Sequence, residues 1–241
     1  MNLLIEIGNS GARVAVAEKD RFLALKRFDT LTFDDLSPFL EQYRPAAAIC
    51  SSVGHDYLQD SVYDELKKHV KKLIHFNHTT LLPIENCYAT PETLGVDRLA
   101  AAVGANYLFP DTDCLIIDCG TAITIDFLNH SGKFLGGNIS PGLRTRFKAL
   151  NAFTAKLPLE DLADNVPLMG TTTATAIQAG VIHGVRYEIE TYIKKNPHCT
   201  IIFTGGDAFF FAKSIKDTIF VVCNLVFIGL NRVINYNVYH L

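Results

Sequence analysis

Strand-like and helix-like segments follow one another in this 241-residue chain in an order that occurs twice. Apolar alternation and turn residues predict three strands at residues 2–8, 12–18 and 21–28, then a helix at about 33–43 and a strand at 46–52. A helix with apolar side chains at Tyr63, Leu66 and Val70 and the strand KLIHF complete this first half. Alternating strands and helices are typical of an α/β protein whose helices cover the sheet.

The second half repeats this layout after a helix that begins near Thr93 and the turn Phe109-Pro110-Asp111. Three strands come first, in CLIIDCG, AITIDFL and KFLGGNI, and helices follow near 142–151 and 173–195. The strand TIIFTGG, a helix near 207–215, the strand TIFVV and a last helix to about residue 237 end the chain. The shared layout indicates a duplication, and we expect two domains, residues 1–110 and 111–241.

Composition excludes several classes of protein. The chain is 49% hydrophobic and 20% charged, which gives ample material for a packed core and no signature of disorder. A net charge of −3 disfavours a nucleic-acid partner. The apolar runs are too short for a membrane span and the N-terminus does not resemble a signal peptide, so we expect a cytoplasmic protein with no membrane partner. The six cysteines include no Cys-x-x-Cys pair, and His75-Phe-Asn-His78 offers only two histidines, so we expect reduced thiols and no zinc site.

Each half carries an acid near the end of its first strand. Glu6-Ile-Gly-Asn-Ser10 ends that strand in the first half, and Asp118-Cys-Gly-Thr-Ala122 ends it in the second. Glycine allows a tight hairpin whose backbone N–H groups converge on an anion, and Asn9, Ser10 and Thr121 add side-chain donors. A nearby carboxylate can hold the Mg²⁺ of a polyphosphate through water. Either hairpin alone is explained as well by a simple turn, but the duplication favours phosphate binding.

A third stretch, Gly95-Val-Asp97-Arg98, lies before a helix of small residues. Asp97 is explained equally well as a first-turn acid favoured by the helix dipole, with Arg98 as a solvated surface cation. Alternatively, Asp97 is a general base that receives a hydroxyl proton during phosphoryl transfer, and Arg98 holds an anionic substrate. The four residues by themselves do not decide between these interpretations.

Six motifs in this order resemble those of the type III pantothenate kinases. They are LLIEIGNSGARVAV, TLGVDRLAAAVGA, IIDCGTAITIDF, GGNISPGLRTRFKALNAFTAKLP, GTTTATAIQAGVIHG and FTGGDA. The resemblance covers almost the whole chain, and it implies a fold of two duplicated ribonuclease-H-like domains of the actin-like ATPase type, with mixed sheets flanked by helices. It also implies that ATP phosphorylates the terminal hydroxyl of pantothenate, which opens coenzyme A synthesis, and that the protein is a homodimer.

The resemblance also implies roles for individual residues. Asp97 would be the catalytic proton acceptor. Pantothenate would contact Tyr88, Gly95, Val96, Asp97, Arg98 and Thr173. ATP would contact Thr121 and the first phosphate loop, which is Glu6, Ile7, Gly8, Asn9, Ser10, Gly11, Ala12 and Arg13. Asp118 would ligate a monovalent cation, K⁺ or NH₄⁺, beside the Mg²⁺ that accompanies ATP, and Gly205-Gly206-Asp207 resembles the family's nucleotide-side turn.

The first phosphate loop departs from the family pattern at two positions. The family normally has aspartate where this chain has Glu6, and commonly threonine where it has Ser10. Serine keeps the hydroxyl, whereas glutamate moves the carboxylate by about a bond length, and misplacements near 1 Å can cost ~10²-fold in rate. We therefore expect position 6 to affect catalytic efficiency and metal preference more than the fold.

Two other functions stay open on the residues. A catalytically weak relative that binds nucleotide and acts as an accessory or regulatory factor would share this fold, and the altered Glu6 keeps that alternative open. Another enzyme of the superfamily, such as a phosphatase acting on polyphosphate, would also share it. The presence of Asp97, Arg98, Asp118 and Thr121 favours the kinase.

Overall fold

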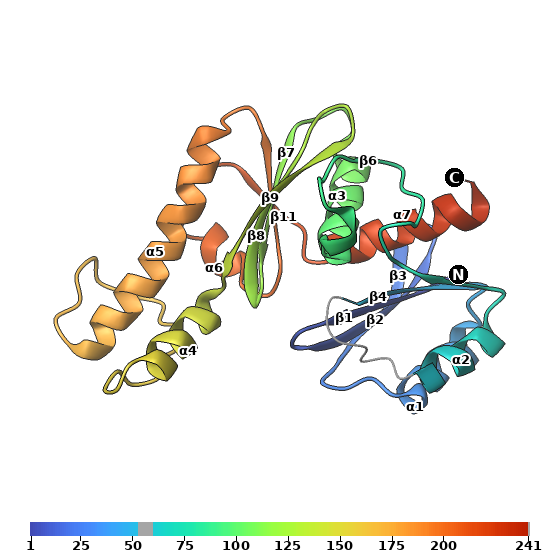
Figure 1. Ribbon diagram of the computed structural model, residues 1–241, viewed down its shortest axis with the longest axis horizontal. Helices are drawn as coiled ribbons and strands as arrows, with labels where there is room; N and C mark the ends of the chain where they lie inside the picture. Colours follow the sequence, from blue (N-terminus) through green and yellow to red (C-terminus); the bar gives the residue numbers. More distant parts are fainter. Residues whose placement is uncertain (53–59, 241) are drawn as a thin grey trace. The chain divides into compact units, whose positions relative to one another are not determined.

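The computed structural model describes residues 1–52 and 60–240, and its contacts divide the chain into two compact units (Figure 1). Unit 1 contains residues 1–112, 128–136 and 224–241, and unit 2 contains residues 113–127 and 137–223. The last helix of the chain therefore packs with the first residues of the chain. The sequence analysis predicted a boundary between two duplicated domains at residues 110 and 111, and this boundary stays a prediction.

Unit 1 is built on a five-stranded sheet with the order β3-β2-β1-β4-β5. β1 pairs with β2 in antiparallel fashion and with β4 in parallel fashion. The strands are β1 (Asn2–Gly8), β2 (Gly11–Glu18), β3 (Arg21–Phe28), β4 (Ala47–Ser52) and β5 (Lys72–His75). The meander followed by parallel strands agrees with the predicted order of the first half.

Helices cover both faces of this sheet (Figure 1). α1 (Phe33–Tyr43) and α2 (Asp60–His69) pack on one face, where their apolar side chains join alternate residues of β1, β2 and β4 in one core. α3 (Val96–Leu108) and α7 (Leu225–Tyr239) contact the sheet through β1 and β4 and pack closely against each other. A Cβ added at Gly229 would overlap the carbonyl oxygen of Ala100, so only glycine permits this approach of the two helices.

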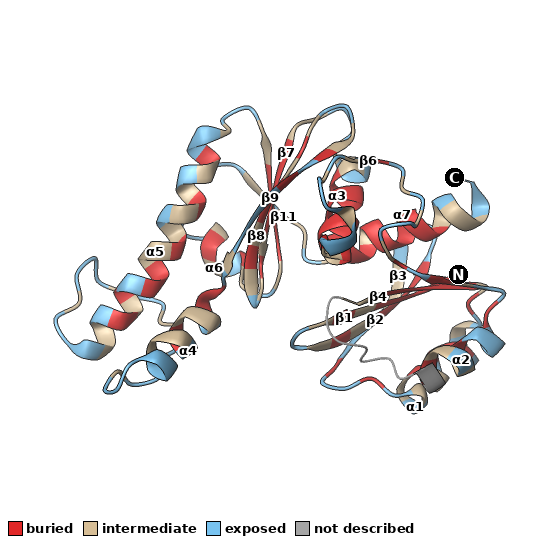
Figure 2. Ribbon diagram, in the orientation of Figure 1, coloured by how far each residue is buried: buried red, intermediate tan, exposed pale blue. Residues whose placement is uncertain are grey.

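Unit 2 contains most of a six-stranded sheet with the order β11-β10-β7-β8-β9-β6. The strands are β6 (Glu85–Asn86), β7 (Cys114–Cys119), β8 (Ala122–Leu128), β9 (Lys133–Pro141), β10 (Thr200–Thr204) and β11 (Ile219–Val221). β6 and the start of β9, which pair in parallel, belong to unit 1. The core of unit 2 joins β7, β8 and β10 to the helices α4 (Leu143–Phe153), α5 (Thr173–Lys195) and α6 (Ala208–Ala212). Figure 2 shows the consequence on α5, where buried and exposed stretches alternate along the helix.

The predicted α/β class with two sheets flanked by helices is confirmed. The main differences are local: the helix expected near Thr93 begins at Val96, after a 3₁₀ turn at Pro91–Thr93, and the two-residue strand β6 was not predicted. Within the part of the chain that the structure describes, no helix is both long and apolar enough to cross a bilayer.

Candidate active site

The side-chain alternation of β1 explains why an acid lies inside a strand. Leu3, Ile5 and Ile7 face α1 and α2, where they belong to the core of unit 1. Glu6 therefore faces the opposite side, which α3 and α7 cover. Arg13 is paired with Glu6 on the neighbouring strand β2, and its Nε donates to Glu6 Oε2 at 2.7 Å. Glu6 is thus a largely buried carboxylate with a cation on the neighbouring strand.

The surroundings of Glu6 raise the pKa of its carboxyl overall. Burial raises the pKa of its carboxyl, Arg13 lowers it by charge and hydrogen bonding, and the charge of Asp97 raises it. The Arg13 guanidinium also lies 5.2 Å from the centre of the Phe227 ring on α7. Ser51 on the other neighbouring strand, β4, is also paired with Glu6. Its buried hydroxyl has no hydrogen-bond partner among the described residues. A carboxylate, a guanidinium and a hydroxyl group therefore lie on three neighbouring strands at this end of β1.

The predicted phosphate loop forms the hairpin between β1 and β2. Asn9 and Ser10 are exposed at its tip, and Gly8 pairs with Gly11. Gly11 has a φ of +122°, and a Cβ there would lie 2.5 Å from the carbonyl oxygen of Phe28. Glycine is therefore required both by the backbone angle and by the close approach of β3. The tip leaves short polar side chains facing solvent, as an anion site needs.

The start of α3 carries Asp97 and Arg98. Gly95 is the N-cap, and the Asp97 carboxylate accepts the backbone N–H of Arg98 at 2.8 Å. Arg98 is only 5% exposed, so the interpretation of this residue as a solvated surface cation is wrong. Its guanidinium lies 5.5 Å from the ring centre of Tyr88 and 5.8 Å from that of Phe134. Unit 1 thus brings the predicted residues Tyr88 and Arg98 together.

In unit 2, the other predicted acid lies at the end of β7. Leu115, Ile117 and Cys119 belong to the core beneath α4 and α5, so Asp118 points to the opposite face of the sheet. A Cβ on Gly205, whose φ is +88°, would overlap the Asp118 carboxylate. The Asp207 N–H donates to the Cys119 carbonyl at 3.0 Å. The turn Gly205-Gly206-Asp207 therefore lies directly against the end of β7.

Thr121 and Asp207 complete this part of unit 2. The carbonyl of Thr121 accepts the Thr145 hydroxyl at 2.7 Å and the Gly142 N–H at 3.0 Å, which fixes the β7–β8 turn to the start of α4. Burial raises the pKa of Asp207, the charge of Arg144 lowers it, and Asp161 raises it. Two glycine turns and two carboxylates of unit 2 thus lie at the carboxyl ends of neighbouring parallel strands, where α/β proteins usually bind ligands.

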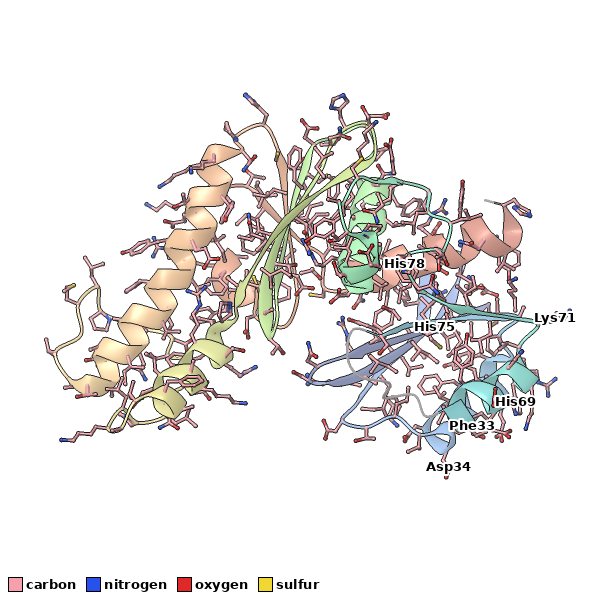
Figure 3. All side chains as sticks on the ribbon, viewed as in Figure 1. Phe33, Asp34, His69, Lys71, His75 and His78 are labelled. Carbon is pink, nitrogen blue, oxygen red and sulfur yellow. The ribbon has the colours of Figure 1, made fainter. Side chains whose placement is uncertain are left out.

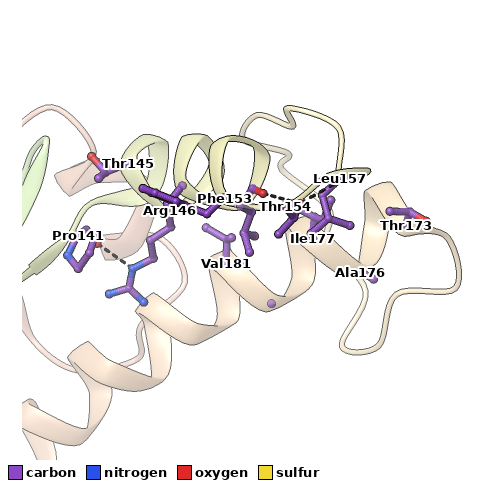
Figure 4. A pocket seen from close by; sticks show the side chains of 13 residues that line it. Pro141, Thr145, Arg146, Phe153, Thr154, Leu157, Thr173, Ala176, Ile177 and Val181 are labelled. Atoms are coloured by element: carbon purple, nitrogen blue, oxygen red, sulfur yellow. Dashed lines mark hydrogen bonds between the residues drawn. The ribbon is translucent and has the colours of Figure 1, made fainter.

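Thr173 lies elsewhere in unit 2, as the exposed first residue of α5. It lines a pocket of about 870 Å³ between α4 and α5 whose other walls are mainly apolar (Figure 4). Arg146 also lines this pocket, and its side chain is held in place: it donates to the Pro141 carbonyl at 2.7 Å and pairs with Glu188. The most exposed apolar side chain of the pocket is Phe153, at 89%.

The two histidines considered for zinc lie in unit 1 at the end of β5 and in the next turn (Figure 3). His75 has a ring neighbour in Tyr63, with ring centres 5.8 Å apart. Among the described residues, no three His, Cys, Asp or Glu side chains cluster in a way that would hold a metal by themselves. Any cation at Glu6 or Asp118 would therefore take further oxygen ligands from water, backbone or substrate.

Comparison with known proteins decides the family. A sequence profile of the type III pantothenate kinases matches residues 2–195. This chain belongs to that family. It is 43% identical to the type III pantothenate kinase of Phocaeicola vulgatus, over 98% of this chain and 99% of that one. It is 42% identical to the type III pantothenate kinase of Bacteroides fragilis, over 98% of each chain.

Solved structures agree on the fold of this type III family member. A Campylobacter jejuni protein, described as a candidate conserved Baf family transcriptional activator, is 26% identical with a TM-score of 0.64, over 98% of both chains. The activator of the 2-hydroxyisocaproyl-CoA dehydratase from Clostridium difficile, solved with bound ADPNP, is 14% identical with a TM-score of 0.58, over 99% of this chain and 96% of that one. The predicted actin-like ATPase fold is confirmed.

Sequence reasoning missed two aromatic residues at the candidate site of this family member. Phe227 stacks on Arg13 from the last helix, and Phe134 stacks on Arg98 from β9. Both lie far along the sequence from the cations they touch, inside ordinary apolar stretches. The sequence offers only a weak signal for Phe134, which is its position two residues before the glycine pair Gly136-Gly137.

Proposed function

We propose that this protein transfers the γ-phosphoryl group of ATP to the terminal hydroxyl of pantothenate, forming 4′-phosphopantothenate and ADP in the first step of coenzyme A synthesis. Membership of the type III pantothenate kinase family over nearly the whole chain carries this proposal. Asp97 and the buried Arg98 support it, because they place a candidate base and a cation together at the start of α3.

Asp97 would accept the hydroxyl proton as the oxygen–phosphorus bond forms, and ADP would leave with the former bridging oxygen. A base placed in this way contributes on the order of 10²–10⁴ in rate. Arg98 would hold the carboxylate of pantothenate, since a guanidinium matches a carboxylate with two parallel hydrogen bonds. Gly95, Val96 and Tyr88 would line the same pocket. Thr173 of unit 2 stays a predicted substrate contact.

Each unit offers a hairpin of the kind that binds nucleotide phosphates. In unit 1 the segment from Glu6 to Arg13 offers the exposed amide and hydroxyl donors of Asn9 and Ser10. In unit 2 Thr121 and the Gly205 turn border the Asp118 carboxylate. Most of the remaining acceleration would come from holding the phosphate and the hydroxyl in line and from neutralising charge.

The donor sets fit the cations that the family uses. Glu6 and the Ser51 hydroxyl, which has no hydrogen-bond partner among the described residues, are hard oxygen ligands of the kind that Mg²⁺ accepts, with water supplying the other positions. Asp118, among the backbone carbonyls of its turn, suits K⁺ or NH₄⁺. When bound, such cations neutralise triphosphate charge. In place of the usual aspartate, Glu6 reaches Arg13 at hydrogen-bonding distance, so its extra methylene is used in an ion pair.

The test is a coupled assay of ADP release with ATP and Mg²⁺, with and without pantothenate, in K⁺ and in Na⁺ buffer. Pantothenate-dependent ADP release that is faster in K⁺, with a phosphorylated product in mass spectrometry, is the expected result. ATP hydrolysis that ignores pantothenate, or pantothenate that stays unmodified, would contradict the proposal.

A regulatory role is the second candidate, because one structural relative is described as a candidate transcriptional activator and position 6 departs from the family pattern. The same assay separates the two functions. Nucleotide binding in calorimetry without any pantothenate turnover would favour the regulatory role.

We also propose a cytoplasmic homodimer. The apolar pocket between α4 and α5, with Phe153 at 89% exposure, supports it, because large exposed apolar patches mark interfaces. Light scattering should give twice the chain mass for the wild type and a lower mass for Phe153→Glu. A monomeric wild type at micromolar concentration would contradict the dimer.

A further inference from the structure

Strand β9 contributes an aromatic ring to the surroundings of Arg98. The Phe134 ring is fully buried, and its centre lies 5.8 Å from the Arg98 guanidinium carbon. The Tyr88 ring lies at 5.5 Å from the same atom, and the two ring centres are 6.3 Å apart. Tyr88, Arg98 and Phe134 thus form one group, called here the Arg98 cluster, from three separate segments of unit 1.

Gly136, two residues further along β9, determines where the Tyr88 ring can lie. Its φ is +102°, and a Cβ there would lie 3.2 and 3.3 Å from Cδ2 and Cε2 of that ring. Such contacts are tighter than ordinary van der Waals packing, so a larger residue would displace the ring. Glycine at this position therefore permits the Arg98 cluster.

The backbone holds the segment of Tyr88 against β9. The short strand β6 pairs with β9 at Asn86 and Phe134, and the Cys87 N–H donates to the Phe134 carbonyl at 3.0 Å. The Asn86 side chain accepts the Tyr88 N–H at 3.0 Å. At the other end of the contact between β6 and β9, Lys133 Nζ and Glu85 Oε2 form an ion pair at 2.9 Å. The position of Tyr88 is thus set by β9 on both its backbone and its ring.

We propose that Phe134 and Gly136 are positioning residues that hold Arg98 and Tyr88 so that the site selects a substrate with a carboxylate. Ring faces on a buried guanidinium limit its rotation and keep it away from water, where its attraction for a carboxylate would be screened. The fork of the guanidinium then keeps a fixed direction for two parallel hydrogen bonds. This inference rests on the proposed function, because it names what makes that site specific.

The experiment compares Gly136→Ala with Gly132→Ala. Both glycines have positive φ, but a Cβ on Gly132 would meet Asn106 at 3.4 Å and would leave Tyr88 untouched. The measured quantity is kcat/KM for pantothenate divided by kcat/KM for its uncharged primary amide, in which the carboxylate is replaced. Because a hydrogen bond to a charged group is worth more than a factor of ten, we expect this ratio to fall about tenfold in Gly136→Ala and to stay constant in Gly132→Ala. The KM for ATP should not change.

A second variant, Phe134→Leu, keeps the apolar volume but removes the ring face, and the same fall in selectivity is expected. Phe134→Leu tests the inference by itself if Gly136→Ala does not fold. An unchanged selectivity ratio in the folded variants, or a wild type that does not prefer the carboxylate, would overturn the inference. Equal losses on both substrates would also overturn it, because they indicate a merely structural role. A wild type that phosphorylates neither compound would instead overturn the proposed function.

Discussion

Removal of the Arg13 side chain charge tests the electrostatics around Glu6. Arg13→Leu leaves a carboxylate that is 13% exposed without its hydrogen-bonded cation. Breaking a buried pair costs about 3–5 kcal/mol, whereas an exposed pair is worth less than about 1 kcal/mol. Since Arg13 is itself 33% exposed, screening places the expected loss of unfolding free energy near 2 kcal/mol at pH 8.

This loss should depend on pH, and its sign follows from the raised pKa of Glu6. Burial and the charge of Asp97 raise that pKa, and Arg13 opposes the rise. Without Arg13 the folded pKa lies higher still, so at pH values between the unfolded and the folded pKa of Glu6 the native state binds more protons than the unfolded state. Stability then falls as the pH rises through this window. The variant should therefore lose less stability at pH 5 than at pH 8.

The assay is urea unfolding followed by circular dichroism at pH 5 and pH 8, without nucleotide or metal. Arg27→Leu is the matched control, because Arg27 is exposed on β3 beside Arg13 and should change stability by less than about 0.5 kcal/mol at either pH. The double variant Glu6→Gln/Arg13→Leu should lose the pH dependence. Equal losses at both pH values in Arg13→Leu would refute the reasoning.

Glycines give two further predictions. Gly229→Ala should destabilise the protein by about 2–4 kcal/mol in thermal or urea unfolding, because the methyl group would overlap a carbonyl of α3. Gly180→Ala in α5 is the control: it has open space around it and should be neutral or stabilising by up to about 1 kcal/mol. Equal effects would contradict the close packing of α3 and α7. Gly205→Ala should weaken binding of a fluorescent ATP analogue at least about tenfold by displacing Asp118, since small misplacements cost this much or more, and Gly206→Ala, also in open space, should not. Similar affinities in both variants would exclude this turn from the nucleotide site.

Local patterns predicted most of the fold. The strands of the first meander and the helix at 173–195 follow from side-chain periodicity and turn residues, and the capping Thr172 with Thr175 marks the start of that helix. The β6 strand escaped prediction because two residues carry no period. Its pairing with β9 depends on a contact between distant segments.

The sequence indicated the acids and glycines of the candidate site but not the aromatic side chains around them. Glu6 and Asp118 stand out because a carboxylate in an apolar strand needs an explanation. Phe227 and Phe134 have none of this contrast, since a phenylalanine in an apolar stretch indicates core packing. Arg98 could not be called buried from the sequence, because its burial comes from rings that other elements supply.

The central claim concerns Asp97, and single-turnover transfer of phosphate from ATP to pantothenate tests it most directly. Asp97→Asn should slow this step by about 10²–10⁴-fold without weakening ATP binding, because the amide cannot accept the proton. Asp34→Asn, which changes an exposed first-turn acid of α1, should leave the rate unchanged. A transfer rate in Asp97→Asn within a few-fold of the wild type would contradict the account.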